Sequence, residues 1–315
     1  MELKRPLPLG NLGPLVPDTI CTMSPVALYF ASGESLYPGA ILLILTVTAS
    51  LFLKQGWLAR MRNIVAWLSL AMIGMACVPA PWWEYLLLLG LYSAWYIAAN
   101  RRTQTGGVQL KLKATFAAVL SLTLILISVV ELSHRNMPRI ASQPTPRLAV
   151  LGDSISAGFA SAGSSWPTIL EQNTGVVVKN LSQPGAHVMD GVGMATRLSV
   201  QDRLVVIELG GNDLLQGSST REFEQALDKL FSVVAVSGRT VVMFELPLLP
   251  HKIAYGQVQR RLADKYGITL IPKRFFIEIL GSTKSTTDGL HLSLIGSQRM
   301  AALVTRLFAP VLKPQ

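Results

Sequence analysis

The sequence predicts two parts of different fold class: an all-α membrane domain of about four transmembrane helices, followed by a three-layer α/β/α sandwich with a parallel sheet. Two observations predict this division. The first half contains four apolar segments almost free of charged residues, whereas the second half alternates short strand-like runs with helical patterns. A proline-containing stretch at 132–146 separates the two parts and is predicted to be a linker.

The four apolar segments are predicted to be transmembrane helices. They follow an N-terminal tail at 1–37 and lie at 38–53, 64–78, 82–99 and 114–130. A spanning helix needs about 17 residues, and each segment is close to this lower limit. A helical bundle in water would place a polar face on each helix, and these segments have none. We therefore expect residues 38–131 to form a transmembrane domain whose main partner is the lipid bilayer.

The basic residues of this half predict its orientation. Lys and Arg gather between the first and second segments and between the third and fourth, and loops of this kind face the cytoplasm. The fourth helix then leaves on the outer side, which places residues 147–315 on the periplasmic side of a bacterial inner membrane. The net charge is +10, but no basic stripe with interleaved aromatic residues follows, so we expect anionic headgroups and no nucleic acid as partners.

Five strand-like runs follow the linker, with helical patterns between them. The runs cover 148–151, 176–179, 204–208, 240–245 and 269–271. This alternation predicts a parallel sheet with helices on both faces, and about 165 residues suffice for one independent core. Functional side chains in such sheets lie beyond the carboxyl ends of the strands.

Polar residues follow the first three strand-like runs directly. Ser154 ends a Gly-Asp-Ser turn, Gly185 lies in a polar turn, and Asn212 follows two glycines. Each cluster alone is also typical of an ordinary turn or helix cap. Asp288 and His291 lie near the C-terminus and are three residues apart, so in a turn their side chains can bind each other.

These residue types suit nucleophilic catalysis. A serine hydroxyl needs an imidazole to accept its proton, a carboxylate to orient that imidazole, and hydrogen-bond donors for the oxyanion. The carboxylates of Asp153, Glu208 and Asp213 are expected to brace their own turns through hydrogen bonds to the backbone. No His or Cys cluster with metal-ligand spacing is present in the sequence, so we expect no metal and no cofactor.

Together the four clusters resemble the SGNH, or GDSL, hydrolases, whose four blocks supply Ser, Gly, Asn and His in this chain order. The corresponding residues are Ser154, Gly185, Asn212 and His291, with Asp288 as the carboxylate of the Asp-x-x-His block. The resemblance covers about 147–312. It is closest to the thioesterase I, lysophospholipase and arylesterase branch, because the segments 155–158, 165–167 and 207–209 also match that branch. No G-x-S-x-G elbow is present, which argues against the common α/β-hydrolase fold.

The resemblance implies that Ser154, Asp288 and His291 are catalytic and that Ser154, Gly185 and Asn212 form the oxyanion hole. We therefore expect a membrane-anchored serine esterase that hydrolyses a lysophospholipid or another lipid or aryl ester outside the cytoplasm. One alternative is an O-acetyl esterase acting on envelope or exported polysaccharide. An alternative of another class is a non-catalytic envelope scaffold or binding module, which the complete set of catalytic residue types argues against.

Overall fold

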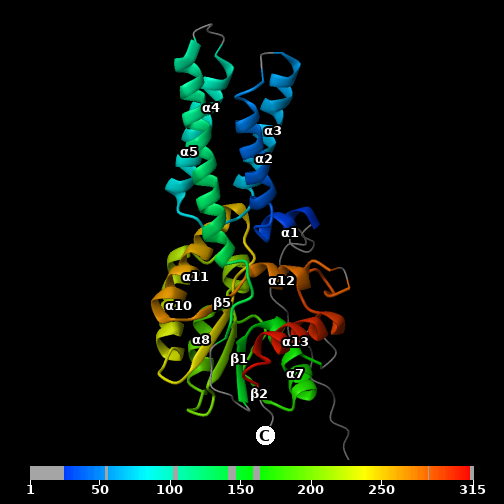
Figure 1. Cartoon of the computed structure of the whole chain (residues 1–315). Coiled ribbons are helices and arrows are strands. Elements are labelled where there is room, and N and C mark those ends of the chain that lie inside the picture. The colour runs from blue at the N-terminus through cyan, green and yellow to red at the C-terminus, as the bar shows by residue number, and fades with distance from the viewer. Residues whose placement is uncertain are drawn as a thin grey trace, which may run out of the picture.

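The computed structural model describes residues 25–53, 56–101, 106–140, 147–158, 164–282 and 284–312 of the 315-residue chain. A bundle of helices stands on one end of an α/β domain (Figure 1). The predicted division into an all-α first half and an α/β second half is confirmed. Residues 1–24 of the predicted tail and 141–146 of the predicted linker lie outside the described residues.

The described part of the first half contains five helices. They are α1 (Pro25–Ala31), α2 (Leu36–Ala49), α3 (Trp57–Gly74), α4 (Trp82–Asn100) and α5 (Gly106–Ser133). Helix α2 packs against α3 and α5, and α4 packs against α5. Their common core contains Tyr92 and Trp95 of α4, with aliphatic side chains such as Leu43 of α2 and Leu120 of α5. The short helix α1 lies at the base of this bundle (Figure 1).

The helix boundaries differ from the predicted ones. Helix α1 and the first residues of α2 lie within the predicted tail, and α3 and α5 begin earlier than predicted, so that they include basic residues. Lys and Arg are good helix formers, and their long stems let a charge near a helix end reach water. In α3, the buried Arg62 is satisfied by a hydrogen bond of 2.9 Å from Nη2 to Oδ1 of Asn100 on α4.

Among the described residues, one helix is long and apolar enough to cross a membrane by length and composition. It is the segment Gly107–Ser133 of α5, with a hydropathy of 2.2 and only 22% of its most apolar window buried. Helix α2 is apolar but shorter. Helices α3 and α4 contain Arg60, Arg62 and Glu84 as well as several tryptophans and tyrosines, which lower their hydropathy. Four spanning helices therefore remain a prediction.

A five-stranded parallel sheet with strand order β2-β1-β3-β4-β5 organises the second half. The strands are β1 (Arg147–Gly152), β2 (Val177–Asn180), β3 (Leu204–Glu208), β4 (Thr240–Phe244) and β5 (Thr269–Ile271). The five predicted runs are confirmed to within one residue at each end. The helices are α6 (Ser154–Ala157), α7 (Trp166–Thr174), α8 (Val188–Ala195), α9 (Gly211–Leu215), α10 (Thr220–Val234), η2 (Pro250–Lys252), α11 (Ile253–Tyr266), α12 (Lys273–Leu280) and α13 (Leu294–Phe308).

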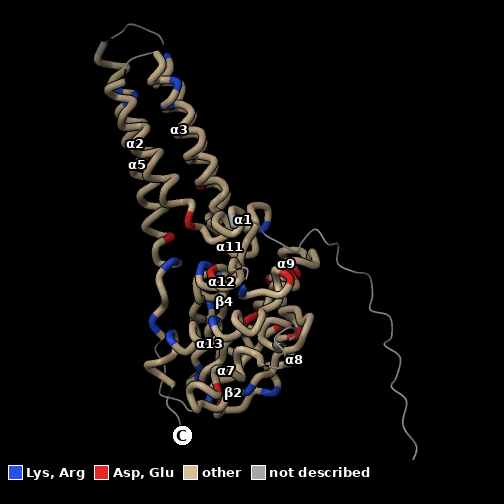
Figure 2. The backbone as a smooth tube through the Cα atoms, turned by 90° about the vertical axis from the view of Figure 1, so that its right-hand side faces the viewer, with Lys and Arg blue, Asp and Glu red and all other residues tan. Residues whose placement is uncertain are grey.

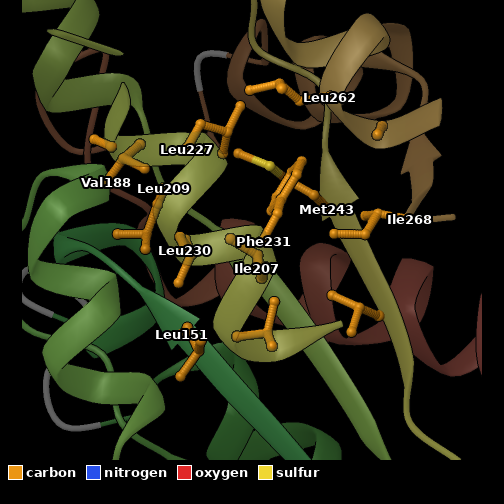
Figure 3. Close-up of a cluster of buried hydrophobic side chains, with 14 of the residues drawn as sticks. Leu151, Val188, Ile207, Leu209, Leu227, Leu230, Phe231, Met243, Leu262 and Ile268 are labelled. Atoms are coloured by element: carbon orange, nitrogen blue, oxygen red, sulfur yellow. The ribbon is translucent and has the colours of Figure 1, made fainter. Parts of the chain in front are cut away.

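The sheet is covered on both faces, as predicted for a three-layer sandwich. Alternate residues of each strand point to opposite sides: Ala149 and Leu151 of β1 pack with α8, α10 and α11, whereas Leu148 and Val150 pack with α7, α12 and α13. Figure 3 shows part of the first core, where Phe231 lies between the sheet and its covering helices. Because both faces are buried, the central strands β1, β3 and β4 are mostly apolar and show no alternation of polar residues, whereas the edge strand β2 is partly exposed and ends in Lys179 and Asn180.

Candidate active site

Ser154, the predicted nucleophile, lies just beyond the carboxyl end of β1, in the turn that leads into α6. The turn is tight, because a Cβ atom on Gly152 would lie 2.5 Å from Cβ of Ser156. Asp153 caps α6: its Oδ1 accepts a hydrogen bond of 2.9 Å from the N–H of Ile155. Ser154 is therefore the first residue of a helix, where a backbone N–H has no partner within the helix and can serve a ligand.

The turn that contains Gly185 runs beside the serine turn. The N–H of Gln183 donates to the carbonyl of Gly152 at 3.0 Å, so the chain that follows β2 stays alongside the end of β1. Gly185 has a φ of 77°, in the left-handed region that favours glycine. A Cβ atom at Gly185 would contact nothing within 4 Å, so there is room for a substrate next to this backbone.

Asn212 connects these two turns. It lies in α9, shortly after β3, and its Nδ2 donates to the carbonyl of Ala186 at 3.0 Å and to Oδ2 of Asp153 at 3.3 Å. The Asn212 side chain therefore binds both Ala186, the residue after Gly185, and Asp153, the residue before Ser154. The three predicted residues meet between β1 and β3, where the strand order reverses and where open α/β sheets usually bind ligands.

Asp288 and His291 form the pair that their spacing predicts. Oδ2 of Asp288 lies 2.6 Å from Nδ1 of His291, and Oδ1 of Asp288 accepts from the N–H groups of Leu290 at 3.0 Å and His291 at 2.7 Å. Burial alone would raise the pKa of Asp288, but these hydrogen bonds outweigh it and lower the pKa below its ordinary value. The carboxylate therefore stays ionised at neutral pH and holds the imidazole by Nδ1.

A second polar network lies beneath the serine turn. Glu208, the last residue of β3, is 4% exposed and accepts a hydrogen bond of 2.8 Å from Oγ of Ser156, which in turn accepts one of 3.0 Å from Nε1 of Trp166. Burial raises the pKa of Glu208 well above its ordinary value, and the charge of the adjacent Asp153 raises it further. Burial also raises the pKa of Asp153. Burial therefore favours the neutral, protonated form in this pair of carboxyl groups.

Of the three carboxylates expected to brace their own turns, Asp153, Glu208 and Asp213, only Asp153 does so. Asp153 binds its own turn, but Oδ2 of Asp213 accepts from the N–H of Val188 at 2.9 Å and so fixes the start of α8. Glu208 binds a side chain 52 residues away, which local spacing cannot reveal; its sequence signals are a carboxylate at the end of an apolar strand and the resemblance of segment 207–209 to the thioesterase I, lysophospholipase and arylesterase branch. In the part of the chain that the structure describes, no group of three or more His, Cys, Asp or Glu residues is arranged to hold a metal ion.

Known proteins match the second half of the chain. A model of the GDSL-like Lipase/Acylhydrolase family matches residues 150–299. An arylesterase of Vibrio mimicus is 34% identical over 169 residues, which cover 48% of this chain and 82% of that protein. The thioesterase 1/protease 1/lysophospholipase L1 of Escherichia coli strain K12 is 31% identical over 158 residues, covering 46% of this chain and 74% of that protein. A crystal structure of TesA is 27% identical, with a TM-score of 0.47, and covers 52% of this chain and 99% of that chain.

The match spans the part of the chain in which the candidate site lies. The family model begins before the serine turn and ends after the Asp-x-x-His block, so it includes all five predicted site residues. The relatives are named as an arylesterase and as a thioesterase and lysophospholipase. This chain therefore belongs to the GDSL-like lipase/acylhydrolase family, and it is an SGNH-type esterase.

Proposed function

We propose that this esterase is anchored in a membrane and that it uses Ser154 as nucleophile, with His291 as general base and Asp288 as its orienting carboxylate. The observation that carries the catalytic assignment is the 2.6 Å contact between Oδ2 of Asp288 and Nδ1 of His291. A carboxylate on Nδ1 selects the tautomer in which Nε2 is unprotonated, and this is the form that accepts a serine proton.

The reaction has two halves. Oγ of Ser154 attacks the acyl carbonyl carbon while Nε2 of His291 takes its proton, and the imidazolium then gives that proton to the leaving alcohol. Water next attacks the acyl-enzyme with His291 again as base, which releases the carboxylic acid and restores the serine. Asp288 stabilises the imidazolium in both halves, because its carboxylate stays ionised.

Three donors are proposed to stabilise the negative oxygen of each tetrahedral intermediate. They are the N–H groups of Ser154 and Gly185 and the Nδ2 group of Asn212. Nδ2 of Asn212 donates to Ala186 and Asp153 in this structure, so the amide releases one of these hydrogen bonds when it donates to the substrate oxygen.

The outer surface of the bundle supports its insertion in a bilayer. Large apolar side chains are exposed on all four long helices, among them Ile41 (58%), Leu68 (60%), Leu86 (57%) and Val130 (66%). In water such a surface would promote aggregation, whereas lipid tails match it. Helix α5, with 28 residues, is long enough to cross a hydrocarbon core of about 30 Å. We propose that α2, α3 and α4 cross beside it.

The charge distribution supports the proposed sidedness. Figure 2 shows Lys and Arg gathered at the end of the bundle that lies farthest from the α/β domain. Arg60, Arg101, Lys111 and Lys113 belong to the two predicted basic loops and the adjoining helix ends, whereas Lys54 and Arg102 lie outside the described residues. Because basic segments remain in the cytoplasm, we propose that the esterase domain faces the periplasm of a bacterial inner membrane.

We propose an acyl ester of a lipid as the substrate, since the names of the relatives include lysophospholipase and a bilayer would lie next to the site. A panel of lysophospholipids, p-nitrophenyl esters of graded length and acetylated sugars tests this. Hydrolysis of the lipid esters by the purified full chain, and its loss in Ser154→Ala of equal folding, is the expected result. Hydrolysis of the acetylated sugars alone would favour the polysaccharide alternative, and no hydrolysis of any ester would favour a non-catalytic role.

The sidedness has its own test. Protease added to spheroplasts should digest the region from residue 147 onward, because we place it outside the cytoplasm. Full protection of this region in spheroplasts, with digestion only after lysis, would contradict the proposed topology.

A further inference from the structure

We propose that the edge of the sheet that carries Ser154 faces the bilayer, so that the esterase acts on amphiphilic acyl esters seated in the outer leaflet. This inference rests on the membrane anchoring and serine chemistry proposed above, and it adds where the substrate is held and how it reaches the site. The surface that would contact the leaflet is called the catalytic edge below. It comprises the exposed apolar residues Met189, Leu215, Leu294 and Ile295.

The ends of two strands contact the base of the bundle. Oε1 of Glu245, directly after β4, accepts from Nε of Arg260 at 2.6 Å, and the same guanidinium donates to both carboxylate oxygens of Glu131 on α5, at 2.7 and 2.8 Å. Nζ of Lys273, just after β5, donates to the carbonyl of Cys77 in the connection between α3 and α4. Glu131, Glu245 and Lys273 are 6%, 1% and 2% exposed. The bundle therefore meets the carboxyl ends of β4 and β5.

The register of the strands places Ser154 at the same level. The paired residues are Gly152 with Glu208, Ile207 with Met243, and Phe244 with Ile271. Ser154 lies two residues after Gly152, the last paired residue of β1. Lys273 likewise lies two residues after Ile271, the last paired residue of β5. Because all five strands are parallel, the serine turn lies on the same edge of the sheet as the residues that contact the bundle.

The site lies to one side of the bundle. In the sheet order, β1 is two strands from β4, and neighbouring strands are about 4.8 Å apart, so the serine turn is roughly 10 Å from the strand end that contacts α5 through Arg260. Figure 2 shows α9, which carries Asn212, at the bundle-facing end of the α/β domain and beside the base of the bundle. A lipid next to the bundle would thus lie above the site.

The contacts at the junction fix this orientation. A Cβ atom on Gly256 of α11 would lie 2.7 Å from Cγ of Pro79, so the backbone of α11 packs closely against the Pro79 ring. Nε2 of Gln257 donates to the carbonyl of Ala80 at 2.5 Å. Together with the buried Arg260 bridge, these contacts hold the α/β domain in one position relative to the bundle.

Two tryptophans mark the level of the membrane surface. Trp82 and Trp83 begin α4, directly after the connection that contacts Lys273, and are 72% and 52% exposed. Tryptophan is enriched at the headgroup level of bilayers. The headgroup level therefore coincides with the junction, and by the strand register it coincides with the serine turn.

The exposed apolar residues at this edge fit an amphiphile. Met189, Leu215, Leu294 and Ile295 are 46%, 36%, 48% and 43% exposed, and each follows a predicted site residue by three or four positions. The other large apolar residues exposed on the described part of the α/β domain are valines near the opposite edge: Val177, Val200, Val233 and Val236. The longer apolar side chains thus lie where an alkyl chain would enter. A polysaccharide would present hydroxyl groups at this surface, and its binding would gain nothing from these apolar side chains.

Depth-dependent quenching tests the orientation without using activity. The full chain carrying Leu294→Cys or Val200→Cys, in a Cys21→Ser background that retains the buried Cys77, is labelled with a fluorophore and placed in phosphatidylcholine and phosphatidylglycerol vesicles. We expect quenchers attached to lipid headgroups to reduce the fluorescence at position 294 several-fold more than at position 200. Equal quenching at both positions would overturn the inference, whatever the activity.

Kinetics in the same vesicles test the consequence for substrate. The rate on palmitoyl-lysophosphatidylcholine in the vesicle is divided by the rate on soluble p-nitrophenyl acetate. We expect Leu294→Asp to lower this ratio about tenfold and the control Val200→Asp, at the opposite edge, to leave it unchanged. If both variants change the ratio equally, the catalytic edge does not contact the leaflet. If neither ester is hydrolysed, the proposed function fails, while the quenching result still decides the orientation.

Discussion

Replacement of Arg260 by methionine tests the junction that fixes the α/β domain relative to the helical bundle. The Arg260 side chain is 12% exposed and lies between the carboxylates of Glu131 and Glu245, whose side chains are 7% and 1% exposed. Burial disfavours its charge, but its hydrogen bonds to Glu131 and the charges of both carboxylates raise the pKa of Arg260 above its already high ordinary value. Arg260→Met keeps much of the volume of the side chain and leaves two buried carboxylates without their cation.

The expected effect is large. Removing one member of a buried ion pair destabilises a protein by about 3–5 kcal/mol. For a domain of this size, 1 kcal/mol corresponds to about 2–4 °C in unfolding temperature, so we expect Arg260→Met to lower the Tm by on the order of 10 °C. The assay is thermal unfolding of the full chain in detergent, followed by tryptophan fluorescence.

The adjacent residue provides a matched control. Arg261 lies on the same helix and pairs with Glu224 at 2.8 Å, but these side chains are 57% and 42% exposed. An exposed pair of this kind contributes about 0–1 kcal/mol, so Arg261→Met should change the Tm by only a few degrees. Equal small shifts for the two variants would refute the reasoning, because the junction would then not depend on a buried charge network.

Three further predictions concern the site. Asp288→Asn removes the carboxylate that orients His291, and kcat for a soluble ester should fall on the order of a thousandfold or more with little change in KM; a fall below tenfold would contradict the orienting role. Asn212→Ala removes one oxyanion donor and should lower kcat about a hundredfold, which the same assay measures. Glu208→Gln replaces a group whose pKa is raised by folding, so neutral Glu208 stabilises the wild type below its unfolded pKa and this contribution is lost as pH rises. The Tm of the wild type relative to Glu208→Gln should therefore fall as pH rises above the ordinary pKa of 4.5 toward the raised pKa of the folded state, and a constant difference would show that the Glu208 carboxyl does not titrate differently in the folded state.

The sheet could be predicted because its physical signal is local. Strands buried on both faces are short apolar runs, such as Leu204–Glu208, and polar site residues stand out where each run ends. The Asp288 and His291 pair could be predicted for the same reason, since a separation of three residues lets one turn bring the two side chains together. That Ser154 and Asn212 lie at one edge follows from the further rule that parallel strands end together, whereas their roles were predicted only through the family resemblance.

The remaining features depend on contacts between distant parts of the chain. Glu131 and Arg260 are 129 residues apart, and nothing in either local pattern indicates the partner. The position of the bundle at the carboxyl edge of the sheet, to one side of the serine turn, follows from such contacts and from the strand register, so it could not be predicted from composition or periodicity. The starts of α3 and α5 were also difficult to predict, because basic residues near a helix end remain compatible with a helix.

The proposed reaction depends most directly on Ser154 as the nucleophile. The full chain is treated with a fluorophosphonate, digested with trypsin and analysed by mass spectrometry. We predict a single adduct in the peptide of residues 148–179, located on Ser154 by fragmentation and absent from the folded Ser154→Ala variant. An adduct on another residue, or no adduct on the folded wild type, would contradict the account.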